Sequence, residues 1–579
     1  MADLVNISIN GKSLQVPSDY TVLMAAEEAN IHIPTLCYLK DLNQIGACRM
    51  CVVEIEGARA LQAACVYPVS EGLKVLTNSA RVREARKATL ELILSNHDKS
   101  CLTCKRNRNC ELQKLCEEFN LNETRFEGEK VELEIDNTST SLVRDNNKCV
   151  LCRRCIAACQ NQTVDCITAR DRGFKTSIGA AFNKTMDKVP CVFCGQCITA
   201  CPTGALTEKD DTGKVWDAIK DPEKVVVFQT APAVRAALGE EFGFEAGTPV
   251  TGKMVTAIKE LGVDAAFDTD TGADMTIMEE GTEFIKRFTA GEKLPLITSC
   301  SPGWVKFCEH YYPEFTDNLS SAKSPMEMFG AILKTYYCEK NNIKPENLFV
   351  VAVMPCTSKK FERSRNEFGR DGLPDIDVSI TTRELARMIK SAGIDFANLP
   401  ESHYDQPFGD ATGAAVIFGA TGGVMEAALR TVVEILENKE LDKIDFEAVR
   451  GTQGIKEATL TVAGKEVNIC VAHGLKNARQ VLDSVKAGTA KYDFIEIMAC
   501  PGGCVCGGGQ PIHDAHYLAH HDLKALRAKA LYIEDINAPI RKSHKNPAVD
   551  MLYKEFFGEP GSHKAHELLH THYTKRGRF

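Results

Sequence analysis

The chain has 579 residues, of which 44 % are hydrophobic and 25 % charged, and its formal net charge is −9. This length suits about three to four domains of a globular protein, and the negative charge excludes a basic field that would attract nucleic acid or anionic lipid. No apolar run reaches the roughly 18 residues of a membrane-spanning helix, and the start lacks the pattern of a signal peptide. We therefore expect a cytoplasmic protein with no membrane and no nucleic-acid partner.

Cysteine is the unusual component of the composition. The chain holds 25 cysteines, and 17 of them precede residue 202. No export signal accompanies them, so close groups of cysteine favour metal binding over a disulfide framework.

The N-terminal half divides into small units. Residues 1–80 look β-rich, because polar and apolar residues alternate around Asn10-Gly11, a hairpin signal, before a stretch with helical spacing. Residues 81–121 are helical and charged. A polar stretch, 127–141, looks like a linker, and residues 140–215 carry two cysteine-rich pieces that form a weak internal repeat.

The composition changes after Asp221-Pro222. Apolar runs there alternate with helical patterns, as in α/β proteins. The runs that we expect to be strands begin at Lys224, Pro295, Leu348 and Phe494.

The first cysteine group is Cys37, Cys48, Cys51 and Cys65. A close pair lies between two more distant cysteines, which is near the plant-type [2Fe–2S] pattern, although the first spacing is longer. A zinc ribbon usually has two Cys-x-x-Cys pairs, and only one is present here. We expect a [2Fe–2S] cluster.

The second group is His97, Cys101, Cys104 and Cys110. One imidazole and three thiolates could hold zinc as well as iron and sulfide, so ligand type leaves both open. Its position between two iron–sulfur units favours a [4Fe–4S] cluster with one histidine ligand.

The third group is a doubled Cys-x2-Cys-x2-Cys-x3-Cys pattern. In two-cluster ferredoxins the fourth cysteine of each run binds the other cluster. One predicted [4Fe–4S] cluster therefore takes Cys149, Cys152, Cys155 and Cys201, and the other takes Cys159, Cys191, Cys194 and Cys197. We interpret the remaining Cys116 and Cys166 as small buried residues rather than ligands.

Three later cysteines follow apolar runs that we predict to be strands. Cys300, Cys356 and Cys500 each end such a run and precede or adjoin Pro or Gly, and Cys504 follows on the next turn. Carboxyl ends of strands in an α/β sheet converge on a crevice, so we expect these sulfurs to meet there.

These residues carry a resemblance to the [FeFe]-hydrogenases. Three motifs match: Thr298-Ser-Cys-Ser-Pro-Gly-Trp304, Met354-Pro-Cys-Thr-Ser-Lys-Lys360 and Glu496-Ile-Met-Ala-Cys-Pro-Gly-Gly-Cys504. Gly272 to Glu280 and Phe418 to Glu426 support it, and the front end resembles the iron–sulfur part of respiratory NADH dehydrogenase.

The resemblance implies the fold and the domains. We expect an α/β hydrogenase catalytic domain of two lobes with parallel and mixed sheets, preceded by β-grasp [2Fe–2S] and ferredoxin-like [4Fe–4S] domains. The expected boundaries are 1–80 for the plant-type [2Fe–2S] domain, 81–121 for the His/Cys3 domain, 140–215 for the two-cluster domain and 222–579 for the catalytic domain, whose tail from about 516 resembles a hydrogenase small subunit.

The resemblance also implies an H-cluster, a [4Fe–4S] cube joined through a cysteine sulfur to a two-iron unit with CO, cyanide and azadithiolate. Cys504 matches the bridging cysteine, and Cys356 and Cys500 match cube ligands. Cys300 matches the thiol that exchanges protons with the azadithiolate amine. The proton route maps onto Glu280, Ser320, Glu283 and Arg287. Lys359 matches the lysine that donates to a cyanide. Met354, Met498 and Phe418 match the surroundings of the two-iron unit.

Without the resemblance, Glu280 and Glu283 would be interpreted as a solvated helix face. A carboxyl that acts as a general acid near the site needs a raised pKa, and burial raises the pKa of a carboxyl.

The chain departs from the family at four positions. Ser301 stands where the family has the fourth cysteine of the cube; its oxygen could bind iron, Cys300 could turn to the cube instead, or the position could be open. We favour Cys300 as the proton carrier, with Ser301 facing the cube. Ala233 and Met326 replace polar residues near the two-iron unit, and Cys506 is an extra thiol.

Three functions follow. The ending and the stretch from Arg541 to Pro547 resemble catalytic subunits of NAD(P)-linked, electron-bifurcating hydrogenases, which implies flavin- and iron–sulfur-containing partner subunits, ferredoxin and maturation enzymes. No Gly-x-Gly-x-x-Gly follows a predicted strand, so a nucleotide site would be the partner's. The alternatives are a stand-alone ferredoxin-dependent hydrogenase and a hydrogen or redox sensor with weak activity.

Overall fold

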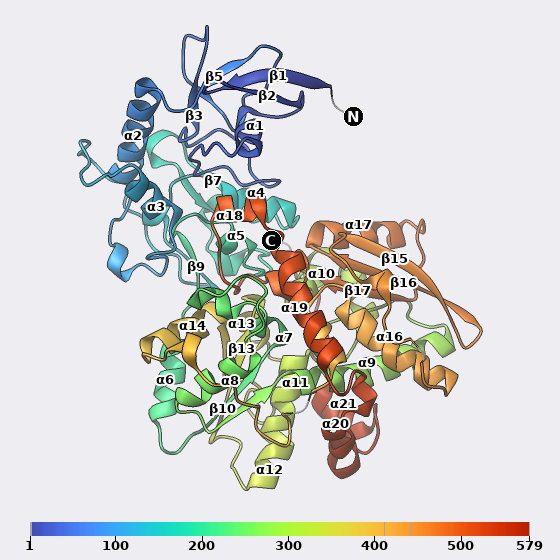
Figure 1. Cartoon of the computed structure of the whole chain (residues 1–579). Coiled ribbons are helices and arrows are strands. Elements are labelled where there is room, and N and C mark those ends of the chain that lie inside the picture. The colour runs from blue at the N-terminus through green and yellow to red at the C-terminus, as the bar shows by residue number, and fades with distance from the viewer. Residues whose placement is uncertain (1–2, 410, 442, 578–579) are drawn as a thin grey trace.

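The N-terminal sheet begins with the predicted hairpin. Strands β1 (Leu4–Ile9) and β2 (Lys12–Pro17) pair antiparallel around Asn10 and Gly11, whose φ angles of 52° and 83° are those of a two-residue turn that matches strand twist. The sheet has the order β2-β1-β5-β3-β4, and α1 (Val22–Glu28) covers it (Figure 1). The other strands are β3 (Val52–Ile55), β4 (Gln62–Ala63) and β5 (Lys74–Leu76).

The whole structure is a computed structural model that describes residues 3–409, 411–441 and 443–577. After the first sheet come helices α2 (Ala80–Ser95) and α3 (Glu111–Glu118). Residues 127–141 form no named helix or strand, but they are anchored, because Val131 N–H donates to Asn96 and Leu133 N–H donates to Asn147.

The cysteine-rich piece that follows has little regular structure. Two short antiparallel pairs hold it, β6 with β9 and β7 with β8, and two short helices carry cysteines inward. The strands are β6 (Leu142–Arg144), β7 (Thr168–Arg170), β8 (Ser177–Gly179) and β9 (Leu206–Glu208), and the helices are α4 (Arg154–Asn161) and α5 (Gln196–Thr199).

One lobe of the catalytic domain contains a fully parallel sheet. The strand order is β11-β10-β13-β14. The strands are mostly apolar, as expected for parallel strands that helices cover on both faces of the sheet. The strands are β10 (Val225–Thr230), β11 (Ala265–Asp268), β13 (Leu348–Met354) and β14 (Val378–Thr381); the helices of this lobe are α6 (Thr212–Lys220), α8 (Thr251–Glu260), α11 (Pro325–Ile332), α12 (Cys338–Asn341) and α14 (Thr382–Ser391).

The other lobe contains a mixed sheet of order β12-β17-β16-β15, in which only β15 runs antiparallel to its neighbour. The predicted two-lobed α/β fold is thus confirmed. Its strands are β12 (Leu296–Ile297), β15 (Ile455–Val462), β16 (Lys465–His473) and β17 (Phe494–Met498), and its helices include α9 (Asp270–Ala290), α10 (Pro302–Tyr311), α16 (Gly423–Glu437) and α17 (Leu475–Lys486).

The C-terminal tail lies against both the iron–sulfur domains and the catalytic domain (Figure 1). Helix α18 lies beside the iron–sulfur domains, while α20 and α21 lie at the catalytic domain (Figure 1). Among the described helices, none is both long and apolar enough to cross a membrane. The tail helices are α18 (Ala515–His520), α19 (Leu523–Asn537), α20 (Pro547–Leu552) and α21 (His563–Leu569).

Candidate active site and iron–sulfur ligand sets

Three strand ends converge between the two lobes. Cys300 follows β12, Cys356 follows β13 and Cys500 follows β17, while Cys504 opens a short turn just beyond. Strands β12 and β16 are parallel to β17, and β13 is parallel to β14, so the carboxyl ends of these strands lie at one edge of each sheet. Cys356 and Cys504 influence the pKa of Cys500, so the cysteines after the strands of the two sheets lie near one another.

The sulfur atoms of this crevice lie close enough to interact. Burial raises the pKa of Cys504 to about 12, and the charge of Cys356 adds to the effect; Cys356 and Cys504 likewise raise the pKa of buried Cys500. Cys300, Cys356 and Cys504 lie deep in the protein yet keep some accessible surface, so an internal space adjoins their sulfurs. A buried set of thiols around such a space fits an iron–sulfur cube.

Ser301 and Cys300 have different surroundings. The Ser301 hydroxyl oxygen accepts a hydrogen bond of 3.2 Å from the N–H of Ala499, the residue before Cys500. The pKa of the Cys300 thiol is raised well above its usual value, first by burial and then by the nearby charges of Glu280 and Cys504. Ser301 thus adjoins the Cys500 side, and Cys300 the Glu280 side.

Lys359 forms a charged anchor next to Cys300. Its ammonium donates to Glu362 at 2.6 Å, to the Ser324 hydroxyl at 2.8 Å and to the Cys300 carbonyl at 3.4 Å. Burial lowers the pKa of Lys359, but Glu362 outweighs it and the net pKa is raised. The lysine therefore keeps a positive charge beside the crevice, where it can donate to an anion.

The residues that the resemblance places around the two-iron unit are apolar and buried. The Gln510 side chain donates to the Ala233 carbonyl at 2.8 Å, and the Gln229 side chain donates to the Met326 carbonyl at 3.2 Å. These bonds fix the backbone of Ala233 and Met326, whose side chains form no hydrogen bond with the described residues. The predicted apolar residues are all at most 4 % exposed: Ala233, Met326, Met354, Phe418 and Met498.

Helix α9 aligns the residues of the expected proton route. Glu280, Glu283 and Arg287 are three and four residues apart, which places them on one helix face. Arg287 donates to Glu283 at 2.5 Å, and the Ser320 hydroxyl, from a different segment, donates to the other oxygen of Glu283 at 3.4 Å. The side chains pass from fully buried Glu280 to partly exposed Glu283 and Arg287.

Glu280 is not on a solvated face. It is 1 % exposed, and neither carboxyl oxygen has a partner of hydrogen-bond geometry among the described residues. Burial raises its pKa to about 8, the Ser320 hydroxyl lowers it in part, and Glu283 raises it further. The carboxyl is consequently protonated at neutral pH and can donate.

The cysteines of the first predicted group lie close together in pairs. Cys51 and Cys65 have sulfurs 3.4 Å apart, and the N–H of Cys48 donates to the Cys37 sulfur at 3.5 Å. A hydrogen bond from Cys48 lowers the pKa of Cys37 to about 6. Thiolate character of this kind suits a ligand of iron.

His97 lines a cavity of about 330 Å³ together with Cys101, Cys104, Cys110 and Cys116. Burial lowers the His97 pKa to about 4, so the ring is neutral at pH 7, the form that binds metal. Its Nδ1 atom is buried with no partner in the described chain. This cavity, with three thiols and one free imidazole nitrogen, fits a cluster; Cys116 also contributes to its wall.

In the doubled pattern, Cys201 lies close enough to Cys149 and Cys152 to influence their pKa values. The pKa of Cys149 is raised to about 12, first by burial and also by the charge of Cys201, and Cys201 acts in the same way on Cys152. Cys166, predicted to be a small buried residue, is indeed 8 % exposed, but its sulfur also lies 3.7 Å from that of Cys159. The sequence offered no signal for this contact.

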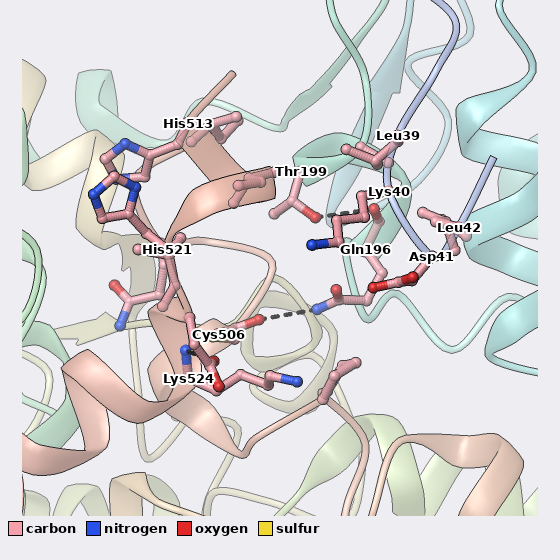
Figure 2. A pocket seen from close by; sticks show the side chains of 18 of the residues that line it. Leu39, Lys40, Asp41, Leu42, Gln196, Thr199, Cys506, His513, His521 and Lys524 are labelled. Carbon is pink, nitrogen blue, oxygen red and sulfur yellow. Dashed lines mark hydrogen bonds between the residues drawn. The ribbon is translucent and has the colours of Figure 1, made fainter. Parts of the chain in front are cut away.

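The two-cluster domain contacts the crevice directly. The Cys500 sulfur lies 4.0 Å from the Cys194 carbonyl oxygen. Gln196 donates to the Cys506 carbonyl at 3.0 Å, beside a cavity of about 570 Å³ that residues 39–42 also line (Figure 2). An electron could therefore pass from this domain to the crevice over a short distance.

Gly195 allows this approach, and its substitution gives a test. It has a φ of 72°, and a Cβ there would lie 2.5 Å from the Thr357 hydroxyl and 2.8 Å from Gly508 Cα. We expect Gly195→Ala to lower the free energy of unfolding by about 2–4 kcal/mol, from overpacking and left-handed strain, and to slow electron entry.

The measurement is thermal unfolding together with the rate at which reduced viologen reduces the cube. Gly173→Ala is the matched control, because Gly173 has a φ of 60° but open space around its Cβ position. This substitution should lower the free energy of unfolding only by the strain of the left-handed backbone. Equal effects of the two substitutions would contradict the importance of the contact.

Two carboxylates near the crevice were not predicted. Glu362 holds Lys359, as described, and Glu496 accepts hydrogen bonds of 2.7 Å from the N–H groups of Gly422 and Met425. Glu496 lies inside the Glu496–Cys504 motif, but only the fold shows what it binds.

Comparison with protein families gives five matches along the chain. The models are "iron only hydrogenase large subunit, C-terminal domain" over residues 224–508 and "iron hydrogenase small subunit" over 521–576. The N-terminal matches are a 2Fe-2S cluster binding domain over 2–80, the NADH-ubiquinone oxidoreductase-G iron–sulfur binding region over 86–125 and a 4Fe-4S dicluster domain over 148–205.

Individual relatives agree. The chain is 49 % identical to the NADP-reducing hydrogenase subunit HndD of Solidesulfovibrio fructosivorans, over 99 % of this chain and 100 % of that one. It is 46 % identical to iron hydrogenase 1 of Clostridium pasteurianum, over 98 % and 100 %. The apo structure of [FeFe]-hydrogenase HydA1 from Chlamydomonas reinhardtii matches with a TM-score of 0.57 and 40 % identity, covering 64 % of this chain and 100 % of that one. The chain therefore belongs to the iron-only, or [FeFe], hydrogenases, oxidoreductases that act on hydrogen through an H-cluster and iron–sulfur clusters.

Proposed function

We propose that the chain is the catalytic subunit of a cytoplasmic, NAD(P)-linked and electron-bifurcating hydrogenase complex. Subunits with flavin and iron–sulfur clusters, and ferredoxin, exchange electrons with its N-terminal domains, and maturation enzymes install the two-iron unit. The name of the HndD relative supports the NADP link, and the match to the NADH-ubiquinone oxidoreductase region supports a partner of that kind.

The cofactors proposed are one [2Fe–2S] cluster, three accessory [4Fe–4S] clusters and the H-cluster. Each accessory cluster takes the ligand set predicted for it from the sequence. The H-cluster takes Cys356, Cys500 and Cys504, with Ser301 at the fourth corner of the cube. The contacts described above support these sets, because each brings its sulfurs into one buried place.

When bound, the H-cluster supplies the two-electron chemistry of hydrogen. The chain's own residues move protons to it and keep water out. The Cys300 thiol carries the proton nearest the cluster, and neutral Glu280 replaces that proton. Glu283 passes protons to Glu280 through the Ser320 hydroxyl. Arg287 holds the Glu283 carboxylate in place at the outer end of the proton route.

The observation that carries this proposal is the buried carboxyl of Glu280 between Cys300 and Ser320 at the convergence of three strand ends. Such a group serves proton transfer, whereas electron transfer or sensing alone does not need it.

The test has two parts. Fully matured protein should evolve hydrogen from reduced viologen, and an affinity-tagged chain should copurify with a flavoprotein that reduces NAD(P)⁺ with hydrogen. Hydrogen evolution with ferredoxin alone and no copurifying flavoprotein would favour the stand-alone enzyme. A complete infrared CO and cyanide spectrum without activity would favour the sensor.

A further inference from the structure

The expected proton route ends at Glu283, but hydrogen bonds continue beyond it into the C-terminal tail. The same Glu283 oxygen that faces Ser320 accepts from the Ser321 N–H at 2.9 Å and the Ser321 hydroxyl at 3.0 Å. The Ser321 oxygen lies 2.8 Å from Nδ1 of His570. Three side chains from three segments are thereby joined in one line.

His570 is fixed on both of its ring nitrogens. Its Nε2 lies 2.8 Å from a carboxylate oxygen of Glu279, whose other oxygen accepts from the Tyr553 hydroxyl at 2.6 Å. The backbone around His570 pairs with the segment that carries Ser321, because Thr571 N–H donates to the Ser321 carbonyl at 2.7 Å. The imidazole therefore bridges two carboxylates of α9, Glu279 and Glu283.

The outer face of His570 leads to the surface. The ring of His566, an exposed residue four positions earlier, packs against it with centroids 4.1 Å apart and an angle of 40° between the ring planes. The titratable groups that face or surround His570 are Glu279, Glu283, Lys286 and Arg287 on α9, Tyr553 at the end of α20, His566 on α21, and Tyr573, whose hydroxyl donates to the Ser320 carbonyl at 2.7 Å.

We propose that His570 is a proton-relay residue that forms a second outer branch of the proton route, from the His566 surface through Ser321 to Glu283. This inference rests on the proposed route through Glu283 and Glu280. Imidazole is suited to the task because it exchanges protons near neutral pH, and Nδ1 of His570 faces Ser321 while Nε2 is held by Glu279.

The transfer balances without another reactant. During hydrogen production the Nδ1 proton of the imidazolium passes to the Ser321 oxygen while the Ser321 hydroxyl proton passes to Glu283. The imidazole is then neutral, with its remaining proton on Nε2 against Glu279, so the replacement proton must return to Nδ1. It comes from solvent near His566 once the ring turns Nδ1 away from Ser321, and the Ser321 hydroxyl rotates back toward Glu283. One proton has then moved inward, and His570 and Ser321 have returned to their starting states. Hydrogen oxidation reverses each step.

The alternative is that His570 only clamps the tail, so the experiment must separate a relay from a clamp. The variants are His570→Gln, which can keep hydrogen bonds but not carry a proton, and Ser321→Ala, which cuts the link and leaves the His570–Glu279 pair. His563→Gln, an exposed histidine on the same helix, is the control.

We expect both His570→Gln and Ser321→Ala to lower viologen-driven hydrogen evolution by roughly 10-fold, since the Arg287 end of the route remains, and to raise the solvent deuterium isotope effect. Added imidazole should restore the activity of a His570→Ala variant in proportion to the imidazole concentration. Infrared CO and cyanide bands should match the parent in every variant.

Parent-like rates and pH profiles in both variants would overturn the relay. So would a loss in His570→Gln that appears only with a lower unfolding temperature, with Ser321→Ala unaffected and no rescue by imidazole. If Glu283→Gln is itself fully active, the proposed route through Glu283 fails; if Glu283→Gln is inactive while both relay variants match the parent, only this branch fails.

Discussion

Replacing Glu280 by glutamine will lower hydrogen production by about 10² to 10⁴-fold and, at the same time, stabilise the protein at pH 7 and above. The loss of rate follows from the loss of the carboxylic acid that adjoins both Cys300 and Ser320. Glutamine fills nearly the same volume, so packing around the 1 % exposed side chain should persist.

The gain in stability follows from the raised pKa. The ordinary pKa of 4.5 is raised to about 8 in the folded protein by burial. The folded carboxyl therefore resists ionisation, so the stability of the parent is complete below pH 4.5 and declines as pH rises toward 8. Glutamine cannot ionise, and the variant avoids this decline, which amounts to at most a few kcal/mol.

The measurement is urea unfolding between pH 5 and 9 beside a viologen assay across the same range. In the parent, hydrogen production should fall as pH passes about 8, because Glu280 then ionises. Glu292→Gln, an exposed site just after α9, should change neither property. A Glu280→Gln variant with parental activity would refute the role of this carboxyl, and a parallel pH dependence of stability in the two proteins would refute its raised pKa.

The sequence indicates candidate metal ligands clearly and candidate proton-route residues poorly. The predicted cluster ligands Cys191, Cys194 and Cys197 are close in the chain, because a tight loop must wrap one cluster, so their spacing forms a recognisable motif. The ends of strands can be predicted where a buried parallel strand is a continuous apolar run, as in β13, whereas β17 is buried although it contains Glu496.

Proton-route residues lack such a signal. Glu280 and Glu283 have helical spacing that equally suits a wet surface, and only packing against other segments shows that Glu280 is buried. The partners of Ser321 lie 38 and 249 positions away, at Glu283 and His570. Contacts of this range follow from the tertiary fold, and no local pattern specifies them.

Ser301 concerns the cube itself and leads to the second large effect. If its oxygen occupies the fourth corner, Ser301→Cys will raise the reduction potential of the cube by roughly 60 mV or more, a tenfold change in the electron equilibrium, because a harder oxygen ligand gives way to a soft thiolate. Ser301→Ala, which removes the ligand atom, should lower the iron content of the protein. Its small side chain should leave the surrounding fold intact.

The reason to expect a ligand at this position is geometric. The Ser301 hydroxyl oxygen lies next to the Ala499–Cys500 peptide and accepts the Ala499 N–H at 3.2 Å, while the Cys300 thiol lies beside Glu280 and Cys504. A cysteine at position 301 would occupy the same side as Cys500. Cys300 then keeps its proton role in both proteins, so Ser301→Cys should alter the potential and the bias between hydrogen production and oxidation more than the pH dependence.

Paramagnetic resonance during a redox titration, with iron analysis and infrared spectra, measures these changes. Ser364→Cys, a substitution at an exposed serine whose hydroxyl donates only to the Phe361 carbonyl, controls for an added thiol. Identical potentials in the parent and Ser301→Cys, with full iron in Ser301→Ala, would show that the fourth corner is held by another atom. Cys300 would then be the remaining candidate, and its exchange of protons with Glu280 would have to be abandoned, because a thiolate bound to iron has no proton to give.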